Sequence, residues 1–382
     1  MAVSYGLLST HPPTRCGLAA FNASLAQQLT AAPRSGGIVR VTATGDDPHP
    51  GPGVVHTWPA GSVAGWLGAA AALNAFDVAV VQHEFGIYPG ADGGDILPLL
   101  RRLTVPSIVV LHTVLSTPTP GQRELLGAIA GTAGAVVTMT GTARARLLHG
   151  YAVDPGKVMV IPHGSAAHAD RPAPSRGLPQ LLTWGLLGPG KGVEWALRAV
   201  ALLQDLDPPL RFTVAGQTHP KVLARHGEAY RAGLHRLGAQ LGVAHAVDYR
   251  PGYLDEQALG SLIRSADVVV LPYDSTEQVT SGVLTEAVAA GVPVVATAFP
   301  HAVELLHDGR GLLVPHRNPA ALATAIRRVL TDPAMATRLD RPRPAAVRWP
   351  AVAAQYETLA AGLLAAPPDD HARVARPAGS RT

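Results

Sequence analysis

One stretch, Val268–Thr297, constrains the fold more than any other part of the chain. It contains two short apolar runs rich in β-branched residues, Val268–Leu271 and Val292–Ala296, separated by a polar loop and a helical pattern that begins near Gly282. Unbroken apolar runs of this length are typical of strands that are covered on both faces, as in parallel sheets. The stretch therefore predicts a strand, a loop, a helix and a second strand of a parallel α/β domain.

The polar loop of this stretch is a candidate binding site. Ligands of parallel sheets lie beyond the carboxyl ends of the strands, which here is the loop Pro272–Ser281. The helix start at Ser281 and Gly282 offers free N–H groups and the positive end of a dipole to an anion such as phosphate. Glu286 lies just over one turn further on, where its carboxylate can accept hydrogen bonds from sugar hydroxyls. The alternative is a plain connection and a solvated glutamate, because βαβ units host many functions.

Apolar runs and helical patterns alternate along most of the chain, so we expect doubly wound parallel sheets. A length of 382 residues is enough for two domains. The segment Ala166–Gly177, rich in proline and alanine, is the predicted linker. Within the second half, one long helix is expected over Lys221–Leu241. The predicted organisation is a first domain at 1–168, a second at 169–345, a last helix at 346–366 and a disordered tail at 367–382.

Composition excludes several classes of protein. A hydrophobic content of 47% indicates a well-cored globular chain, and the single cysteine, Cys16, permits no internal disulfide, as is usual in the cytoplasm. The start lacks the pattern of a signal peptide, and no segment offers the roughly 18 to 20 apolar residues of a membrane span. The net charge of +4, without a basic run, argues against nucleic acid. It is compatible with acidic small molecules and with peripheral contact at the inner membrane face.

A glycine-rich loop, GLLGPGKG at Gly185–Gly192, also follows a predicted strand and precedes a helix. Glycines let the backbone approach a phosphate closely, and Lys191 supplies a positive charge. The chain contains only three lysines among 31 basic residues, which favours a specific role for this one. The loop is not a Walker A motif, because Gly192 stands where the magnesium-binding Ser or Thr would be. The alternative is a structural turn. We predict no metal site, because the only D-x-D, Asp205–Asp207, lies without other ligands.

The order of these motifs resembles the retaining glycosyltransferases of family four, which are group 1 glycosyl transferases with the two-domain GT-B fold. The motifs of the second half that carry the resemblance are GLLGPGKG, VAGQTHP, ADVVVLPYDSTEQ, TSGVLTEAVAAGVPVVAT and HAVELL followed by DGRGLLVP. In the first half they are STHPPTRCGLAAF, HTV at His112–Val114 and VIPHG at Val160–Gly164. The resemblance implies two Rossmann-like domains that face each other across a cleft, and a final helix that crosses back to the first domain.

The resemblance also implies roles for single residues. Lys191 corresponds to the lysine that neutralises the diphosphate of the donor, and Glu286 to the acid that binds the ribose hydroxyls. His112 corresponds to the histidine near the anomeric centre and the acceptor hydroxyl. Further donor-binding positions are Gly17, Gly190, Ser281, Gly282 and Glu304. The residues expected to line an acceptor pocket are His83, Glu84 and Tyr88. Ordinary surface and core positions are the alternative for the histidine and for the acceptor loop.

Two positions depart from the family pattern. The first acid of the E-x7-E motif is replaced by Gln278, which can bind a donor sugar but carries no charge to stabilise an oxocarbenium ion. A one-residue bulge would bring the adjacent Glu277 into that place. Leu186 stands where an arginine is usual, so we expect Arg15 or the helix start at Ser281 to meet one phosphate charge.

The function implied by the resemblance is transfer of a hexose, for which mannose is favoured, from a GDP- or UDP-linked donor with retention of configuration. The acceptor would be a hydroxyl of a sugar, a lipid-linked molecule or a small molecule, and no metal or other cofactor is expected. Two alternatives stay open: a nucleotide-sugar-binding pseudo-enzyme, motivated by Gln278 and Leu186, and a sugar-nucleotide epimerase on the same fold. A phosphorylase is disfavoured, because it would usually need a lysine for pyridoxal phosphate.

Overall fold

The computed structural model describes residues 2–31, 35–43, 46–47, 49–62, 64–168, 177–339 and 345–366. Its first half, in chain order with short 3-10 helices labelled η, consists of β1 (Tyr5–Ser9), α1 (Gly17–Leu29), β2 (Gly36–Thr42), β3 (Val54–Pro59), α2 (Gly65–Leu73), β4 (Val78–His83), η1 (Ala91–Gly93), α3 (Ile96–Leu100), β5 (Ser107–Leu111), α4 (Pro120–Thr132), β6 (Ala135–Thr138), α5 (Gly141–Gly150), η2 (Pro155–Lys157) and β7 (Val158–Val160).

The second half contains β8 (Gln180–Trp184), α6 (Val193–Ala201), β9 (Arg211–Ala215), α7 (Pro220–His226), α8 (Ala229–Gln240), η3 (Ala244–Ala246), β10 (Val247–Arg250), α9 (Glu256–Ser265), β11 (Val268–Leu271), α10 (Gly282–Ala289), β12 (Val294–Thr297), α11 (Pro300–Leu305), β13 (Gly311–Val314), α12 (Pro319–Thr331), α13 (Pro333–Leu339), η4 (Ala345–Val347) and α14 (Trp349–Ala365).

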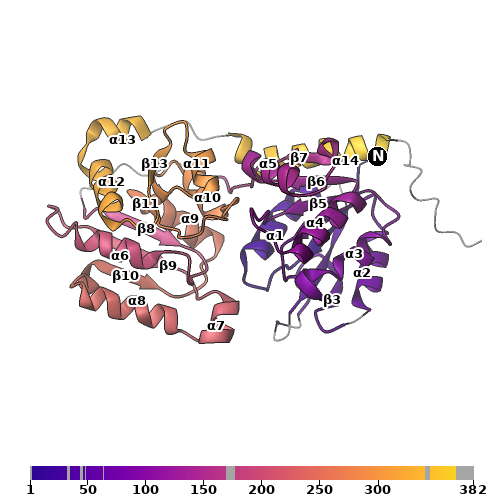
Figure 1. The fold of residues 1–382 in the computed structure, drawn as a ribbon, viewed down its shortest axis with the longest axis horizontal. Helices are drawn as coiled ribbons and strands as arrows, with labels where there is room; N and C mark the ends of the chain where they lie inside the picture. The colour runs from indigo at the N-terminus through magenta and orange to yellow at the C-terminus, as the bar shows by residue number, and fades with distance from the viewer. Residues whose placement is uncertain are drawn as a thin grey trace, which may run out of the picture.

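The strands form two parallel sheets, one in each half of the molecule (Figure 1). The first sheet has the order β3-β2-β1-β4-β5-β6-β7, and the second has the order β10-β9-β8-β11-β12-β13. The strand order reverses between β1 and β4 in one sheet and between β8 and β11 in the other. The predicted pair of doubly wound α/β domains is therefore confirmed.

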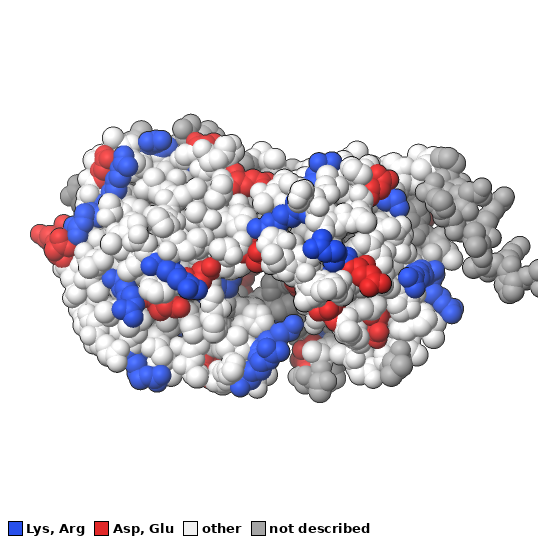
Figure 2. All heavy atoms as spheres, viewed as in Figure 1, with Lys and Arg blue, Asp and Glu red and all other residues white. Residues whose placement is uncertain are grey.

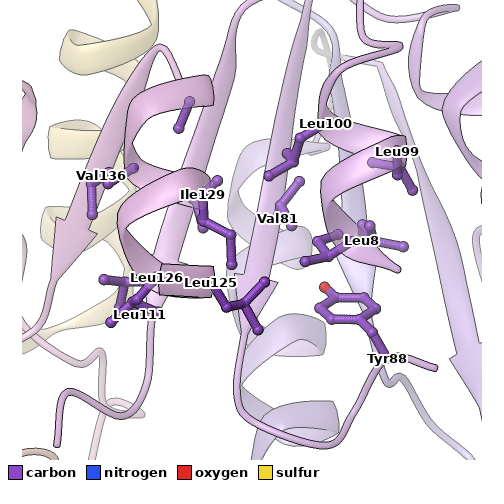
Figure 3. Close-up of a cluster of buried hydrophobic side chains, with 14 of the residues drawn as sticks. Leu8, Val81, Tyr88, Leu99, Leu100, Leu111, Leu125, Leu126, Ile129 and Val136 are labelled. Carbon is purple, nitrogen blue, oxygen red and sulfur yellow. The ribbon is translucent and has the colours of Figure 1, made fainter. Parts of the chain in front are cut away.

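Each sheet is buried on both faces, as the unbroken apolar runs predict. In β4, Val81 packs into the cluster that contains Leu8 and Leu111, drawn in Figure 3, while the neighbouring Val80 packs into a separate cluster with Leu7. This split follows from the alternation of side chains along a strand. The second sheet is likewise covered by two apolar clusters. Cores of this kind hold the carboxyl ends of the strands in fixed positions, from which the loops of the site extend.

The last helix, α14, packs on the first domain, as the resemblance implies. Its side chains Trp349, Val352 and Tyr356 join the cluster that contains Phe21 and Leu25 of α1. Figure 1 shows this yellow helix lying along the indigo and magenta half of the molecule. The Trp349 ring meets the Phe21 ring edge-on, with 5.1 Å between the centroids. The chain thus returns to its first domain after completing the second.

One local prediction is wrong, and one strand was not predicted. The expected helix over Lys221–Leu241 is broken into α7 and α8 at Gly227, whose φ of +56° and ψ of −144° are not helical. The sequence pattern also gives no strand at Gly311–Val314, where β13 pairs with β12. That strand is short and begins at a glycine, so its pairing depends on the neighbouring strand. The 168/169 domain boundary, most of the predicted linker and the tail at 367–382 lie outside the described residues.

No helix in the described ranges combines the length and the apolar character that crossing a membrane would require.

Candidate functional site

The candidate site lies where the loops at the carboxyl ends of the two sheets face each other. In open parallel sheets, ligands bind at the point where the strand order reverses. In the second sheet this point is framed by the loops after β8 and β11, and in the first by the loops after β1 and β4. Figure 2 shows that the surface is hollowed between the two domains.

The glycine-rich loop after β8 packs directly against the loop after β11. The backbone N–H of Asp274 donates to the carbonyl of Gly190 at 3.0 Å. Gly192 has a φ of +66°, and a Cβ there would lie 1.8 Å from the carbonyl oxygen of Pro272. Only glycine allows this conformation and this approach. The glycines predicted to approach a ligand thus also hold the two loops of the site together.

Lys191 is placed by an aromatic side chain of the neighbouring loop. Its Nζ lies 4.4 Å from the centroid of the Tyr273 ring, a cation–π distance. The Tyr273 ring is in turn stacked on Phe299, with 5.0 Å between the centroids. Within the described part of the chain Lys191 forms no ion pair, so its charge is available to an anion.

Helix α10 begins at the predicted position, but part of its N-terminus is occupied. The Ser281 hydroxyl caps the helix by accepting from the N–H of Leu284 at 3.2 Å. The N–H of Ser281 donates to Nδ1 of His301 at 2.8 Å, so this N–H is not free for a phosphate. Burial lowers the pKa of His301 to about 4, which keeps this ring neutral. A Cβ on Gly282 would lie 2.8 Å from Nε2 of His163, so the helix start is packed against the interdomain segment.

Glu286 contacts the segment that connects the two domains. Its Oε2 lies 2.7 Å from Nε2 of His168, and its Oε1 accepts from the N–H of Ala166 at 3.1 Å. The glutamate side chain retains 22% of its exposure. Sequence reasoning did not single out His168, because it lies in a non-periodic segment and contacts a residue 118 positions away.

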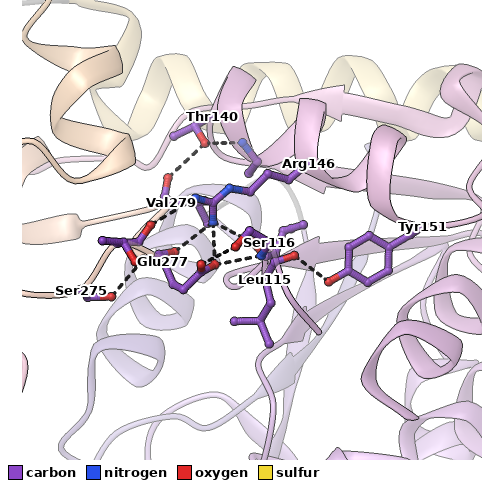
Figure 4. Close-up of polar contacts among 11 residues, drawn as sticks. Leu115, Ser116, Thr140, Arg146, Tyr151, Ser275, Glu277 and Val279 are labelled. Atoms are coloured by element: carbon purple, nitrogen blue, oxygen red, sulfur yellow. Dashed lines mark hydrogen bonds and ion pairs between the residues drawn. The ribbon is translucent and has the colours of Figure 1, made fainter. Parts of the chain in front are cut away.

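The two residues at the first position of the E-x7-E motif are both engaged within the protein. The side-chain amide of Gln278 donates to the carbonyl of Thr280 in its own loop. Glu277 accepts from the N–H of Ser116 and from Nη1 of Arg146, both at 2.9 Å (Figure 4). Burial alone would raise the pKa of Glu277, but the hydrogen bonds from Ser116 and the charge of Arg146 hold it below its ordinary value. Glu277 therefore joins the two domains, and its predicted role toward a donor sugar stays a prediction.

In the first domain, His112 follows β5 and is held by two neighbours. Its Nε2 lies 2.9 Å from Oε1 of Gln82, and its ring meets Phe21 edge-on at 4.8 Å between centroids. Burial, followed by the nearby rings of His163 and His83, lowers the pKa of His112 to about 3. The imidazole is therefore neutral near pH 7 and can donate or accept one hydrogen bond at each nitrogen.

The predicted acceptor pocket is only partly assembled. Tyr88 is buried in the core (Figure 3). Its ring stacks on Trp58, and its hydroxyl donates to the carbonyl of Gln82. His83 is also fully buried, and burial lowers its pKa to about 4. Glu84 is partly exposed and accepts from the Thr113 hydroxyl at 2.6 Å. Because Tyr88 and His83 are buried, Glu84 is the member of the trio that reaches the surface.

Glu304, which was predicted to bind the donor, contacts the first domain, and its role toward a donor stays a prediction. Its carboxylate accepts from the backbone N–H groups of Gly141 and Thr142 at 2.7 and 2.8 Å, at the start of α5 in the first domain. Burial would raise the pKa of Glu304, but these hydrogen bonds and that of the Thr142 hydroxyl keep it lowered. A carboxylate at a helix N-terminus is electrostatically favourable, and here both oxygens of Glu304 accept from the start of α5.

The start of α1 lies opposite the second domain. Gly17 is exposed, and a Cβ there would meet nothing within 4 Å. The carbonyl of Arg15 accepts from the side-chain amide of Gln217 at 3.4 Å, and its guanidinium lies 6.0 Å from the centroid of the Tyr253 ring. In the described ranges no group of three or more His, Cys, Asp or Glu could hold a metal ion. Asp205 instead pairs with Arg327 at 2.6 Å.

Comparisons with known proteins point to one family. The family model described as Glycosyl transferases group 1 matches residues 179–332. The D-inositol 3-phosphate glycosyltransferase of Streptomyces avermitilis is 33% identical over 267 residues, which are 63% of this chain and 56% of that protein. The protein of the same name from Frankia alni is 32% identical over 302 residues, 70% of this chain and 72% of that protein. The chain thus spans little more than half the length of the first of these relatives.

Solved structures agree on the fold. Sucrose-phosphate synthase from Thermosynechococcus elongatus matches with a TM-score of 0.72 and 21% identity, over 95% of this chain and 99% of that chain. The Anabaena protein HepE, solved in complex with UDP-glucose, matches with a TM-score of 0.68 and 16% identity, over 94% and 98% of the two chains. At these identities the likeness concerns the fold alone. Together with the Frankia relative and the two facing parallel sheets, it establishes that the chain belongs to the group 1 glycosyl transferases with the GT-B fold.

Proposed function

We propose that the protein transfers a hexose from a nucleotide-diphosphate sugar to a hydroxyl group. The observation that carries this proposal is that the loop holding Lys191 lies beside helix α10, which carries Glu286. The two elements are close, because a Cβ on Gly185 in the lysine loop would lie 3.5 Å from Val283 of α10. A lysine that forms no ion pair within the described residues suits a diphosphate, and a carboxylate suits the hydroxyls of a ribose.

The proposed reaction proceeds on one face of the donor sugar and retains its configuration. The acceptor oxygen forms a bond to the anomeric carbon while the bond from that carbon to the diphosphate oxygen breaks. The diphosphate leaves with the bonding electrons and takes the proton of the acceptor hydroxyl. Lys191 would stabilise the charge that develops on the leaving group, and the closed cleft would hold the reactants together. We propose that no metal is required, so activity should survive treatment with EDTA.

The donor and the acceptor are also proposals. The complex of HepE with UDP-glucose makes UDP-glucose one candidate, and GDP-mannose is the other that the sequence favours. The name of the Streptomyces and Frankia relatives makes an inositol phosphate the first small acceptor to test. Thermal shifts with UDP- and GDP-sugars would rank the donors, because a ligand that binds the folded state raises the unfolding temperature. Cytoplasmic location and peripheral membrane contact stay predictions.

The role of Lys191 has a direct test with a matched control. Lys191→Ala should weaken donor binding about 10- to 100-fold, because a charge-assisted hydrogen bond contributes about 1.5–3 kcal/mol. Lys157→Ala is the control, since its Nζ donates to the carbonyls of Gly131 and Ala133 in the first domain. Calorimetric titration with the donor measures the affinity of each variant. Equal affinities in the two variants would remove Lys191 from the site.

A second candidate function is donor binding without transfer. It is favoured by the neutral Gln278, whose amide is bonded within its own loop, and by the engagement of Glu277 at the domain interface. Radiolabelled donor offered with candidate acceptors separates the two functions, since only an enzyme yields a labelled product. Under the first proposal Gln278→Glu should change the transfer rate while leaving the donor affinity within about threefold. Binding of a donor with neither transfer nor hydrolysis would favour the second function.

A further inference from the structure

The contact between His168 and Glu286 joins the interdomain segment to the donor-site helix. Nε2 of His168 lies 2.7 Å from Oε2 of Glu286, and Oε1 accepts from the N–H of Ala166 at 3.1 Å. The histidine side chain is only 4% exposed, so the contact is shielded from water. Because an ionised carboxylate can only accept, Nε2 of His168 carries the proton. Both oxygens of Glu286 are thus engaged before any ligand is present.

This arrangement still leaves room for a ligand on the carboxylate. An ionised carboxylate has about four acceptor positions, two on each oxygen. Ala166 and His168 occupy one on each oxygen, which leaves one on each. Two vicinal hydroxyls require two acceptor positions, so the two that remain are sufficient. The 22% of the Glu286 side chain that is exposed allows a ligand to reach them.

The interdomain segment is itself held in place. The N–H of Ser165 donates to the carbonyl of Val347 at 2.7 Å, which ties the segment to the stretch before α14. On its other side, His163 lies so close to the start of α10 that a Cβ on Gly282 would be 2.8 Å from its Nε2. His168 therefore approaches Glu286 from a fixed support, and a side chain fixed before binding loses less conformational freedom on binding.

We infer that His168 is a positioning residue, which orients the Glu286 carboxylate so that its two remaining acceptor positions meet the 2′- and 3′-hydroxyls of the donor ribose. The inference rests on the proposed nucleotide-sugar function and deepens it. It also makes ribose recognition depend on the segment between the two domains. His168, in the segment that connects the two domains, thereby contributes to the affinity of the second domain for the nucleotide.

The test removes His168 and the ribose hydroxyls separately and together. His168→Phe keeps a ring but loses the N–H, and His168→Gln offers an amide N–H in a similar place. Each variant is titrated calorimetrically with UDP and GDP and with their 2′,3′-dideoxy analogues. For the nucleotide that binds, His168→Phe should weaken the ribonucleotide about tenfold and the dideoxy analogue less than twofold, and His168→Gln should recover most of the loss. His245→Phe, at an exposed histidine of η3, should change neither.

Three results would overturn the inference. Equal weakening of the ribo- and dideoxy-nucleotides by His168→Phe would mean that the residue only supports the structure. Unchanged binding of the ribonucleotide would mean that it has no role in recognition. Failure of the wild-type protein to bind either UDP or GDP would overturn the proposed function as well. Lys191→Ala keeps the two proposals apart, since loss of a phosphate contact should weaken ribo- and dideoxy-nucleotides equally.

Discussion

At the scale of single residues, Gln82 decides which ring nitrogen of His112 carries the proton. An amide oxygen only accepts, so the contact from Oε1 of Gln82 places the proton of His112 on Nε2. Nδ1 is then left as an acceptor. Burial keeps the ring neutral, because it lowers the pKa of His112 to about 3. A neutral acceptor of this kind can receive a hydrogen bond from a sugar hydroxyl but cannot supply a positive charge.

Substitution of Gln82 should therefore change the rate more than the binding. Gln82→Leu should lower kcat about tenfold and leave the KM for the donor nearly unchanged, because the ring loses its orienting hydrogen bond. Gln82→Glu should raise the pKa of His112, since a carboxylate stabilises the imidazolium form. Steady-state kinetics and two-bond ¹H–¹⁵N spectra of His112 measure these effects. A wild-type kcat in Gln82→Leu would remove the contact from the mechanism, and exposed Gln240→Leu is the control.

At the scale of elements, two carboxylates of the second domain bind the first domain. Glu277, in the loop before α10, pairs with Arg146 of α5, and Glu304 of α11 accepts from the first N–H groups of the same helix. The hydroxyl of Thr140, just before α5, also donates to the carbonyl of Val279 at 3.0 Å (Figure 4). The loop after β11 is thus fixed by α5 as well as by its own sheet, which would stabilise the proposed donor site.

The pair of Glu277 and Arg146 should contribute measurably to stability. Their side chains are 35% and 19% exposed, so screening by water limits the coupling to about 1 kcal/mol. A double-mutant cycle with Glu277→Gln and Arg146→Ala, followed by denaturant unfolding, measures it. The more exposed pair Arg328–Asp332, 4.0 Å apart, is the matched control and should give almost no coupling. Equal coupling in the two cycles would contradict a special role for the interface pair.

At the scale of the whole molecule, the sequence predicted the features that depend on local pattern. The buried strand β11 was predicted with its observed bounds, and helix α10 was predicted to begin near Gly282, where it does begin, because apolar runs and periodicity are local signals. Contacts between the domains were not predictable in this way. Glu304 meets Gly141 across 163 residues, and no periodic pattern records such a partner. Tyr88 carries a polar group but is buried, since its ring stacks on Trp58 and its hydroxyl donates to the carbonyl of Gln82.

The same burial should make the fold sensitive to acid. His83, His112 and His301 have pKa values lowered by burial to about 4, 3 and 4, against an ordinary value of 6.5. Above about pH 6.5 these rings are neutral in both the folded and the unfolded chain, so stability is at its full value. As the pH falls below that, the unfolded chain takes up protons that the folded protein excludes.

The free energy of unfolding should therefore decrease as the pH falls from about 6.5 to about 4, by up to about 4 kcal/mol per pH unit when all three rings contribute. Glu277 and Glu304, whose pKa values are lowered, act in the same direction below this range. Urea unfolding at constant ionic strength between pH 7.5 and pH 5 measures the slope. His83→Gln should reduce that slope, because one of the excluded protons is lost. A stability that stays constant over this range would mean that water or a ligand reaches these rings in solution.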